Sequence, residues 1–363
     1  MGNLYSRLTK SNSGASSPCE EIKDKYPKPN LKDYSLNDLN NQIVGKMPGY
    51  VNGQQFLIHN CIGSVIYIFD HMNTVTIDDC SNCAFILGPV KESLFIRDCE
   101  NCICIAASGQ FRARDCRSLD LFLCCPTQPT IESSFKLKFN CLQLYYHDFM
   151  DHMKMARLSQ FNNVWSCVHD FTPYDGKEGS IGGHWSISGH ESEPCIPLES
   201  HEDFSRVGLS FSREKSVVPH TISPSAKEIN LAISQRVHLK ISACLIVFVK
   251  EAGDHHNVAM EFTRAIQTLH PNCSLTSSKE VYMKADHPFA RNTFGRSFDG
   301  GMVVGLRFFG PCCWEICQEE AGLKGKECEG VERNMKDWLL GNSMFACRNK
   351  RKGTNIGWNQ SSA

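Results

Sequence analysis

One short phrase recurs along residues 56–141 and limits the fold of this chain more than any other feature. Each copy alternates apolar and polar residues, continues with Asp or Asn, and ends in Cys. The cysteines that end the five copies are Cys61, Cys80, Cys99, Cys116 and Cys141, spaced 19, 19, 17 and 25 residues apart. A period of about 20 residues with strand-like alternation is typical of a parallel β-helix, in which each repeat forms one coil.

The same cysteines also fit a second interpretation, a structural metal site. Cys80, Cys83, Cys99 and Cys102 have the spacing of a four-cysteine zinc site. In other coils, however, the position of Cys83 and Cys102 is occupied by serine or leucine. These residues are Ser64, Leu119 and Leu144. A thiol that shares its position with leucine behaves as a small buried apolar group. We therefore expect core cysteines and no metal, with a zinc-organised scaffold as the weaker alternative.

Composition and charge exclude several classes of protein. The net charge is −1 and the pI is about 6.9, so no nucleic-acid surface is expected. The sequence contains no apolar run of about 18 residues, so no membrane-spanning helix is predicted. Twenty cysteines without a secretory leader favour a cytoplasmic protein with reduced thiols. No Gly-x-x-x-x-Gly-Lys-Ser/Thr loop is present, so we expect no phosphate-binding loop in the chain itself.

The chain divides by composition into five parts. Residues 1–36 are rich in Ser, Asn, Lys and Pro and predict a disordered arm. The coils occupy 37–173, and an unpatterned stretch rich in Gly, Ser, Pro and His at 174–238 predicts a linker. A second folded domain is expected over 239–340, followed by a basic tail over 341–363.

The second domain is predicted from the order of its elements. A continuous apolar run at 243–249 indicates a buried strand, and residues 255–269 have helical apolar spacing. Further strands are predicted at 275–283 and 301–309, and another helix over 313–318. This order is that of a small ferredoxin-like α/β sandwich, similar in outline to nucleoside diphosphate kinase. Its phosphohistidine motif, Asn-x-x-His-Gly-Ser, is missing from the sequence, which favours a structural or partner-binding unit over a kinase.

The coils resemble those of the X-linked retinitis pigmentosa protein family, whose members carry a tubulin-cofactor-C domain. The similarity is dense from about 40 to 175 and thinner from 240 to 310. The matching stretches are Gly53–Ile58, Ile66–His71, Thr74–Cys80, Leu87–Lys91, Gln110–Arg112, Phe122–Cys125, Thr127–Pro129 and His169–Pro173. These motifs are long and occur in order, so the resemblance is specific.

The resemblance implies a right-handed parallel β-helix that activates GTP hydrolysis by Arf-like small GTPases. The family supplies a catalytic arginine from a Gln-x-Arg motif, which falls here on Gln110 and Arg112. Family interface positions match Glu132 and Phe171. The residue before the motif is Gly109, where a close relative usually has glutamine, so one polar contact to the GTPase is expected to be missing.

Strand alternation places Arg112 and Arg114 on one face, with Phe111 and Ala113 on the other. The two arginines then form an exposed basic site, in which Arg112 could stabilise the γ-phosphate of GTP. The resemblance implies that Gln110 orients water or the glutamine of the GTPase, and that Glu132 fixes a guanidinium. Spacing by itself leaves open a solvated arginine pair within a surface ion network.

The first residues of the chain match a lipidation pattern. Gly2 followed by Ser6 fits N-myristoylation, and the family is acylated at its N-terminus. Asn3 replaces the palmitoylated cysteine of the close relative, so membrane binding through one acyl chain is expected to be weak and reversible. The expected location is cytoplasmic, on the inner face of the plasma membrane, and the resemblance adds the base of the cilium.

Together these features predict a GTPase activator that is not itself an enzyme. The partner, an Arf-like GTPase in its GTP form, would bind the GTP and Mg²⁺, so no cofactor is expected in this chain, and the implied role is lipidated-protein trafficking. The alternative is a non-catalytic adaptor or tubulin-folding factor, which binds a GTPase or tubulin through the β-helix.

Overall fold

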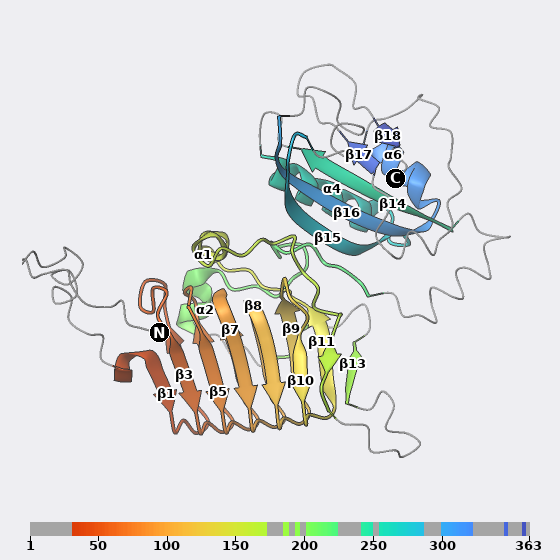
Figure 1. The fold of residues 1–363 in the computed structure, drawn as a ribbon. Coiled ribbons are helices and arrows are strands. Elements are labelled where there is room, and N and C mark those ends of the chain that lie inside the picture. The colour runs from red at the N-terminus through yellow and green to blue at the C-terminus, as the bar shows by residue number, and fades with distance from the viewer. Residues whose placement is uncertain are drawn as a thin grey trace, which may run out of the picture.

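The computed structural model contains a solenoid of stacked strands and a separate α/β unit (Figure 1). Among the residues that it describes, no helix is long and apolar enough to cross a membrane. The described residues are 31–172, 184–188, 193–196, 201–223, 241–249, 254–286, 299–321, 345–347 and 358–360. The expected arm at 1–36 therefore lies mostly outside the described residues, as does most of the basic tail.

The solenoid has two faces built from parallel strands, and it confirms the predicted β-helix. The first face contains β1 (Ser35–Asn37), β3 (Phe56–His59), β5 (Val75–Asp78), β7 (Val90–Arg97), β10 (Thr130–Glu132) and β12 (His169–Asp170). The second face contains β2 (Ile43–Lys46), β4 (Val65–Ile68), β6 (Ala84–Leu87), β9 (Asp120–Cys124), β11 (Leu137–Cys141) and β13 (Trp185–Ile187). The long strand β8 (Ile103–Arg114) contributes to both faces: its first half pairs with β6 and β9, and its second half with β7 and β10.

In the first four repeats the Asp or Asn forms a corner of the coil. Asn60, Asp79, Asp98 and Asp115 have φ of 54°, 54°, 52° and 53°. This left-handed conformation is costly for most L-residues, while Asn and Asp adopt it more readily because their short polar side chains bond locally. The repeat therefore combines a strand with the residue that ends it and turns the chain.

The corner cysteines are buried, and their thiols have polar partners. Cys80, Cys99 and Cys116 each donate Sγ–H to the carbonyl oxygen two residues earlier, at 3.2, 3.1 and 3.2 Å. At the next corner of the same face, Ser134 makes the equivalent bond to the oxygen of Glu132 at 2.8 Å. This position thus selects a small side chain with a donor, which is a narrower requirement than the apolar one expected from the sequence.

The prediction that Cys141 occupies the same position of the coil as Cys61, Cys80, Cys99 and Cys116 is wrong. Cys141 lies in β11 of the second face, opposite Leu123, whereas Ser134, 18 residues after Cys116, occupies the next corner of the first face. Residues 135–141 also alternate and end in Asn-Cys, so the pattern resembled a first-face coil. The true position contains serine because the corner requires a hydrogen-bond donor rather than a thiol.

Parts of the expected linker belong to the solenoid. Strand β13 pairs in parallel with β11. The helix α2 (Glu202–Val207) buries Phe204 and Val207 in the solenoid core. Trp165 Nε1 donates to Thr221 Oγ1 at 2.8 Å. The range 174–238 is polar in composition, so these short contacts gave no periodic signal. They reach the solenoid at separate places, because Phe204 packs against Tyr67 and Phe69 while β13 extends the second face beyond β11.

The second unit is an α/β domain with the predicted order of elements. Its sheet has the order β15-β16-β14-β17-β18. The elements are β14 (Ile241–Val249), α4 (His255–Leu269), β15 (Ser274–Met283), β16 (Gly301–Pro311), α6 (Cys313–Glu320), β17 (Phe345–Cys347) and β18 (Trp358–Gln360). The sheet extends through β17 and β18 beyond residue 340, the predicted end of this domain.

A residue from the segment after the coils packs into the core of the second unit. Phe161, which follows the short helix α1 (Phe149–Met155), is 0 % exposed and belongs to the core of the α/β domain. Its carbonyl oxygen accepts a bond from Ser278 Oγ at 2.8 Å, and Asn162 Oδ1 accepts one from the backbone N–H of Glu280 at 2.8 Å. The segment that follows α1 therefore docks the second domain onto the solenoid.

The role of the corner donor can be tested with two buried cysteines. Cys99→Ser should lower the free energy of unfolding by less than about 1 kcal/mol, because the hydroxyl can donate to the oxygen of Arg97. Cys104, 1 % exposed in β8, has no hydrogen-bond acceptor among the described residues, and burial raises its pKa to about 12. Cys104→Ser should therefore cost about 1–3 kcal/mol. Urea unfolding of both variants measures the difference, and equal losses would contradict the assigned role of the corner bond.

Candidate functional site

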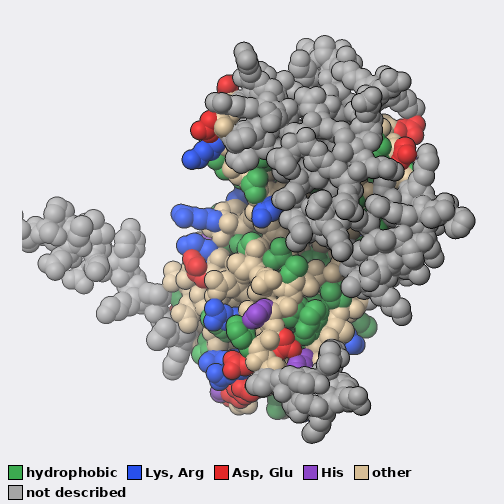
Figure 2. All heavy atoms as spheres, turned by 45° about the vertical axis from the view of Figure 1, so that its right-hand side comes forward, with side chains coloured by type: hydrophobic (Ala, Val, Ile, Leu, Met, Phe, Trp, Pro, Cys, Tyr) green, Lys and Arg blue, Asp and Glu red, His purple; other side chains and the backbone are tan. Residues whose placement is uncertain are grey.

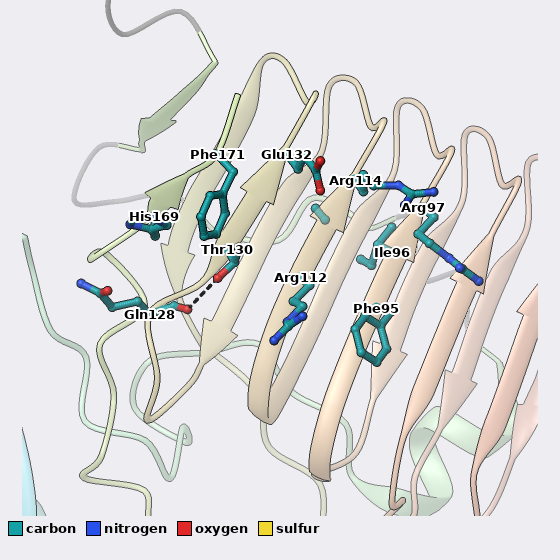
Figure 3. Close-up of a pocket in the computed structure, with 11 residues that line it drawn as sticks. Phe95, Ile96, Arg97, Arg112, Arg114, Gln128, Thr130, Glu132, His169 and Phe171 are labelled. Atoms are coloured by element: carbon teal, nitrogen blue, oxygen red, sulfur yellow. Dashed lines mark hydrogen bonds between the residues drawn. The ribbon is translucent and has the colours of Figure 1, made fainter. Parts of the chain in front are cut away.

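Two columns of side chains run across the first face of the solenoid (Figure 3). Parallel strands in register place equivalent residues of successive coils next to one another, about 4.8 Å apart. The first column is Phe95, Arg112, Thr130 and His169. The second column is Arg97, Arg114 and Glu132, beyond which Phe171 follows on the last strand.

These columns line a groove of about 610 Å³. Gln128 lies at one end of it, and Phe171 stands over the strands opposite Arg112 (Figure 3). The groove thus offers cationic groups, one carboxylate and two aromatic rings to a partner. Over the rest of the described surface visible in Figure 2, basic and acidic side chains are interspersed.

Arg112 differs from the other two arginines of the groove. Its guanidinium lies 5.9 Å from the centroid of the Phe95 ring, and it makes no ion pair or hydrogen bond to any described residue. Arg97, in contrast, donates from Nε and Nη2 to the Asp78 carboxylate at 2.8 and 2.7 Å. The cation–π contact supports the Arg112 side chain without neutralising its charge. Its donors therefore remain available to an anion.

The predicted alternation of β8 is confirmed. Phe111 and Ala113 are 1 % and 2 % exposed, while Arg112 and Arg114 are exposed on the first face. Arg114 Nε donates to Asp115 Oδ2 at 3.0 Å. The alternative of a surface ion network thus describes Arg114 but not Arg112.

Gln110 lies beside the groove and not within its lining. Its exposed side chain accepts a bond from Ser93 Oγ at 3.4 Å. The preceding residue, Gly109, has no room for a side chain. A Cβ there would lie 2.4 Å from the backbone oxygen of Lys91 and 2.7 Å from that of Glu92. A larger residue at this position requires a different path of β7, so the glycine belongs to the backbone packing of this coil.

Glu132 and Phe171 both project from the solenoid. The Glu132 side chain is exposed next to Arg114 and makes no ion pair among the described residues. Phe171 is 61 % exposed, and its ring packs edge-on against His169 with centroids 4.3 Å apart. An aromatic ring this exposed contributes little to the core and is well placed for a partner.

Asp170 fixes the strand that carries these aromatic residues. Its carboxylate accepts from the Thr172 backbone N–H at 2.8 Å and contacts His184 Nδ1 at 2.7 Å. Burial raises the pKa of Asp170, but hydrogen bonds from Thr172 and His184 outweigh it and hold that pKa below its usual range. Sequence reasoning missed this pair because His184 lies in the expected linker. Gln128, Thr130 and His169 were also missed, and their positions follow from strand register rather than from a motif.

Comparison with known proteins agrees with this geometry. A family model described as tubulin binding cofactor C matches residues 53–171, a range that includes every residue of the groove. The solenoid and its groove therefore form a tubulin-cofactor-C domain.

Full-length relatives then define the family. Protein XRP2 of Homo sapiens is 38 % identical over 333 residues, which cover 88 % of this chain and 89 % of that protein. Protein XRP2 of Danio rerio is 42 % identical over 319 residues, covering 86 % and 80 %. The chain belongs to the XRP2 family, the retinitis pigmentosa protein family that its motifs resemble. A solved tubulin binding cofactor C from Leishmania major aligns with a TM-score of 0.29 at 20 % identity, over 41 % of this chain and 89 % of that one, a similarity too low to support an inference.

The role of Asp170 leads to a prediction about pH. Asp170→Ala should lower the free energy of unfolding by about 1 kcal/mol at neutral pH, because it removes an acceptor shared by Thr172 and His184. The folded pKa is depressed, so this stabilisation is present above the unfolded Asp pKa of about 3.9 and is lost as the pH falls through the lower folded value. Urea unfolding of wild type and variant should converge in acid, and a difference independent of pH would refute the assignment.

Proposed function

We propose that the solenoid is a GTPase activator that supplies Arg112 in trans to an Arf-like small GTPase. The observation that supports this most directly is the state of Arg112, which is exposed, supported by the Phe95 ring and not paired with any described carboxylate. A structural arginine would be held in an ion pair, as Arg97 is by Asp78. The resemblance of Gln110 and Arg112 to the family motif is the second support.

The proposed chemistry is stabilisation of charge on the transferred phosphoryl group. Hydrolysis of GTP develops charge on the γ-phosphate oxygens, and an arginine supplied by a second protein contributes about 10³–10⁵ in rate. Arginine suits this task because its planar group contacts two oxygens at once and keeps its charge when water is excluded. The GTPase would bring the nucleotide and Mg²⁺, and this chain would add the cation.

The rest of the groove would hold the GTPase in place. Phe171 offers an exposed aromatic surface of the kind that dominates binding energy at interfaces. Glu132, which is free of a described ion-pair partner, can accept a guanidinium or ammonium group of the GTPase. Gln110 lies two positions before Arg112 on the same strand, outside the groove lining, and its proposed role of orienting water or the glutamine of the GTPase follows from its place in the family motif.

The arginine can be tested by single-turnover GTP hydrolysis with a panel of Arf-like GTPases. Arg112→Ala should lower the stimulated rate by about 10³-fold or more, and Arg112→Lys should restore little of it, since lysine lacks the planar fork. Arg117→Ala is a matched control, because Arg117 is also exposed but lies at a coil corner outside the groove. If Arg112→Lys retained most of the activity, the proposed mechanism would be wrong. Binding without any stimulation by wild type would identify an adaptor instead.

Substitution of Phe171 should affect binding of the GTPase but not the catalytic step. Phe171→Ala should raise the concentration needed for half-maximal stimulation by about 30-fold, corresponding to roughly 2 kcal/mol, and leave the rate at saturation unchanged. Its melting temperature should stay close to that of wild type, because the ring is 61 % exposed. A large fall in melting temperature with unchanged affinity would show that Phe171 is part of the core.

We further propose that Gly2 is myristoylated and that the protein associates reversibly with the cytoplasmic face of a membrane; the plasma membrane and the cilium base are the locations that the resemblance suggests. Gly2 lies outside the described residues, and the proposal depends on the pattern Gly2 to Ser6 and on the family resemblance. Gly2→Ala should shift the protein from the membrane fraction to the soluble fraction in cells and leave stimulation of a soluble GTPase unchanged. Unchanged membrane retention of Gly2→Ala would show that a different element anchors the chain.

A further inference from the structure

Four buried cysteines converge in the core of the α/β domain. Cys244 lies in β14, Cys273 directly precedes β15, and Cys313 and Cys317 are one turn apart on α6. They are 0 %, 1 %, 0 % and 0 % exposed. Three elements that are distant in sequence therefore deliver thiols to one place, which sequence spacing did not reveal.

The sulfur atoms lie at distances that suit a shared ligand. Cys273 Sγ is 2.9 Å from Cys313 Sγ, and Cys313 Sγ is 3.9 Å from Cys317 Sγ. The sulfurs of these three residues all lie within 4.8 Å of one another. Cys244 neighbours Cys317 but lies outside this group of three, so its side chain would have to move towards the cluster to complete a site. A tetrahedral zinc with Zn–S bonds of about 2.3 Å holds its sulfurs about 3.8 Å apart. The observed separations lie on both sides of this value, so small side-chain rotations can produce the coordination geometry.

These thiols differ from those of the solenoid in what they contact. Each corner cysteine there donates to a backbone carbonyl oxygen, as Cys99 does to Arg97 at 3.1 Å. Cys273, Cys313 and Cys317 instead contact other sulfur atoms and make no hydrogen bond to oxygen among the described residues. The 2.9 Å contact is also shorter than the roughly 3.5–4 Å of an ordinary nonbonded carbon contact. Packing of neutral thiols accounts poorly for such an arrangement.

Metal is bound by the thiolate form of cysteine, and the position of one of these residues favours that form. Cys313 is the first residue of α6, where the positive end of the helix dipole stabilises negative sulfur. A negative cluster in this core is thus partly compensated by the protein.

We propose that Cys273, Cys313 and Cys317, completed by Cys244, form a structural zinc site in the α/β domain. Binding would displace the thiol protons to solvent and form zinc–sulfur bonds, without any change of oxidation state. Four protein ligands leave no open position for water or substrate, so the site is structural rather than catalytic. The metal would connect α6 to β14 and to the start of β15, and so hold a helix of only 8 residues on the sheet.

The experiment is a metal analysis of the full chain, purified from cells grown with zinc. Wild type should contain about one zinc per chain, and Cys313→Ser and Cys317→Ser should lose most of it. Cys312→Ser is the matched control, because this exposed thiol adjoins Cys313 but points outside the cluster, and it should keep its zinc. Cys102→Ser tests the solenoid in the same way and should also keep it.

A second measurement does not depend on the variants folding. Wild type stripped of metal and loaded with Co²⁺ should show the intense visible absorption of tetrahedral cobalt bound by thiolates. Wild type that lacks both zinc and this absorption would overturn the proposal. The proposal would equally be overturned by loss of zinc from Cys102→Ser but not from Cys313→Ser, or by a disulfide between Cys273 and Cys313 in the intact mass.

Discussion

Parallel pairing of each coil with the next is the interaction on which the rest of this structure depends. It satisfies the backbone groups of the inner strands of the stack and places chemically equivalent positions above one another. The corners make this possible, because a left-handed Asp or Asn turns the chain and a small donor after it bonds to the preceding strand. The regular core and the straight columns of side chains both result from this arrangement.

The candidate site is a consequence of the same stacking. Inward residues of each coil are committed to the core, while outward residues are free to vary and form columns across the first face. Within these columns Asp78 neutralises Arg97, and Asp115 neutralises Arg114. Arg112 makes no ion pair in the described structure and contacts the Phe95 ring, so its charge is not compensated by a carboxylate. A rigid scaffold thus holds an uncompensated cation at a fixed position, which is the condition that the proposed catalytic role needs.

Sequence periodicity was sufficient to predict the coils and the exposure of Arg112, because strand alternation decides which side chains face outwards. It failed where a physical requirement can be met by more than one residue type. Ser134 replaces cysteine at a corner that needs a donor, so the pattern was continued to Cys141 on the other face. His184 and Asp170 meet across a segment without periodicity, and the thiols around Cys313 come from three separate elements. Contacts of this kind depend on tertiary packing, so the spacing of residues along the sequence does not predict them.

Phe161 follows the coils in sequence but packs in the core of the α/β domain, so it links the two units. A chain ending before β14 would expose this aromatic ring at the end of the solenoid, together with backbone and amide groups that now bond to Ser278 and Glu280. Such a fragment would retain the groove and Arg112, but it would expose a hydrophobic surface that is prone to aggregation. Premature termination in this region would thus harm the protein through quality control and aggregation, even though every groove residue were still present.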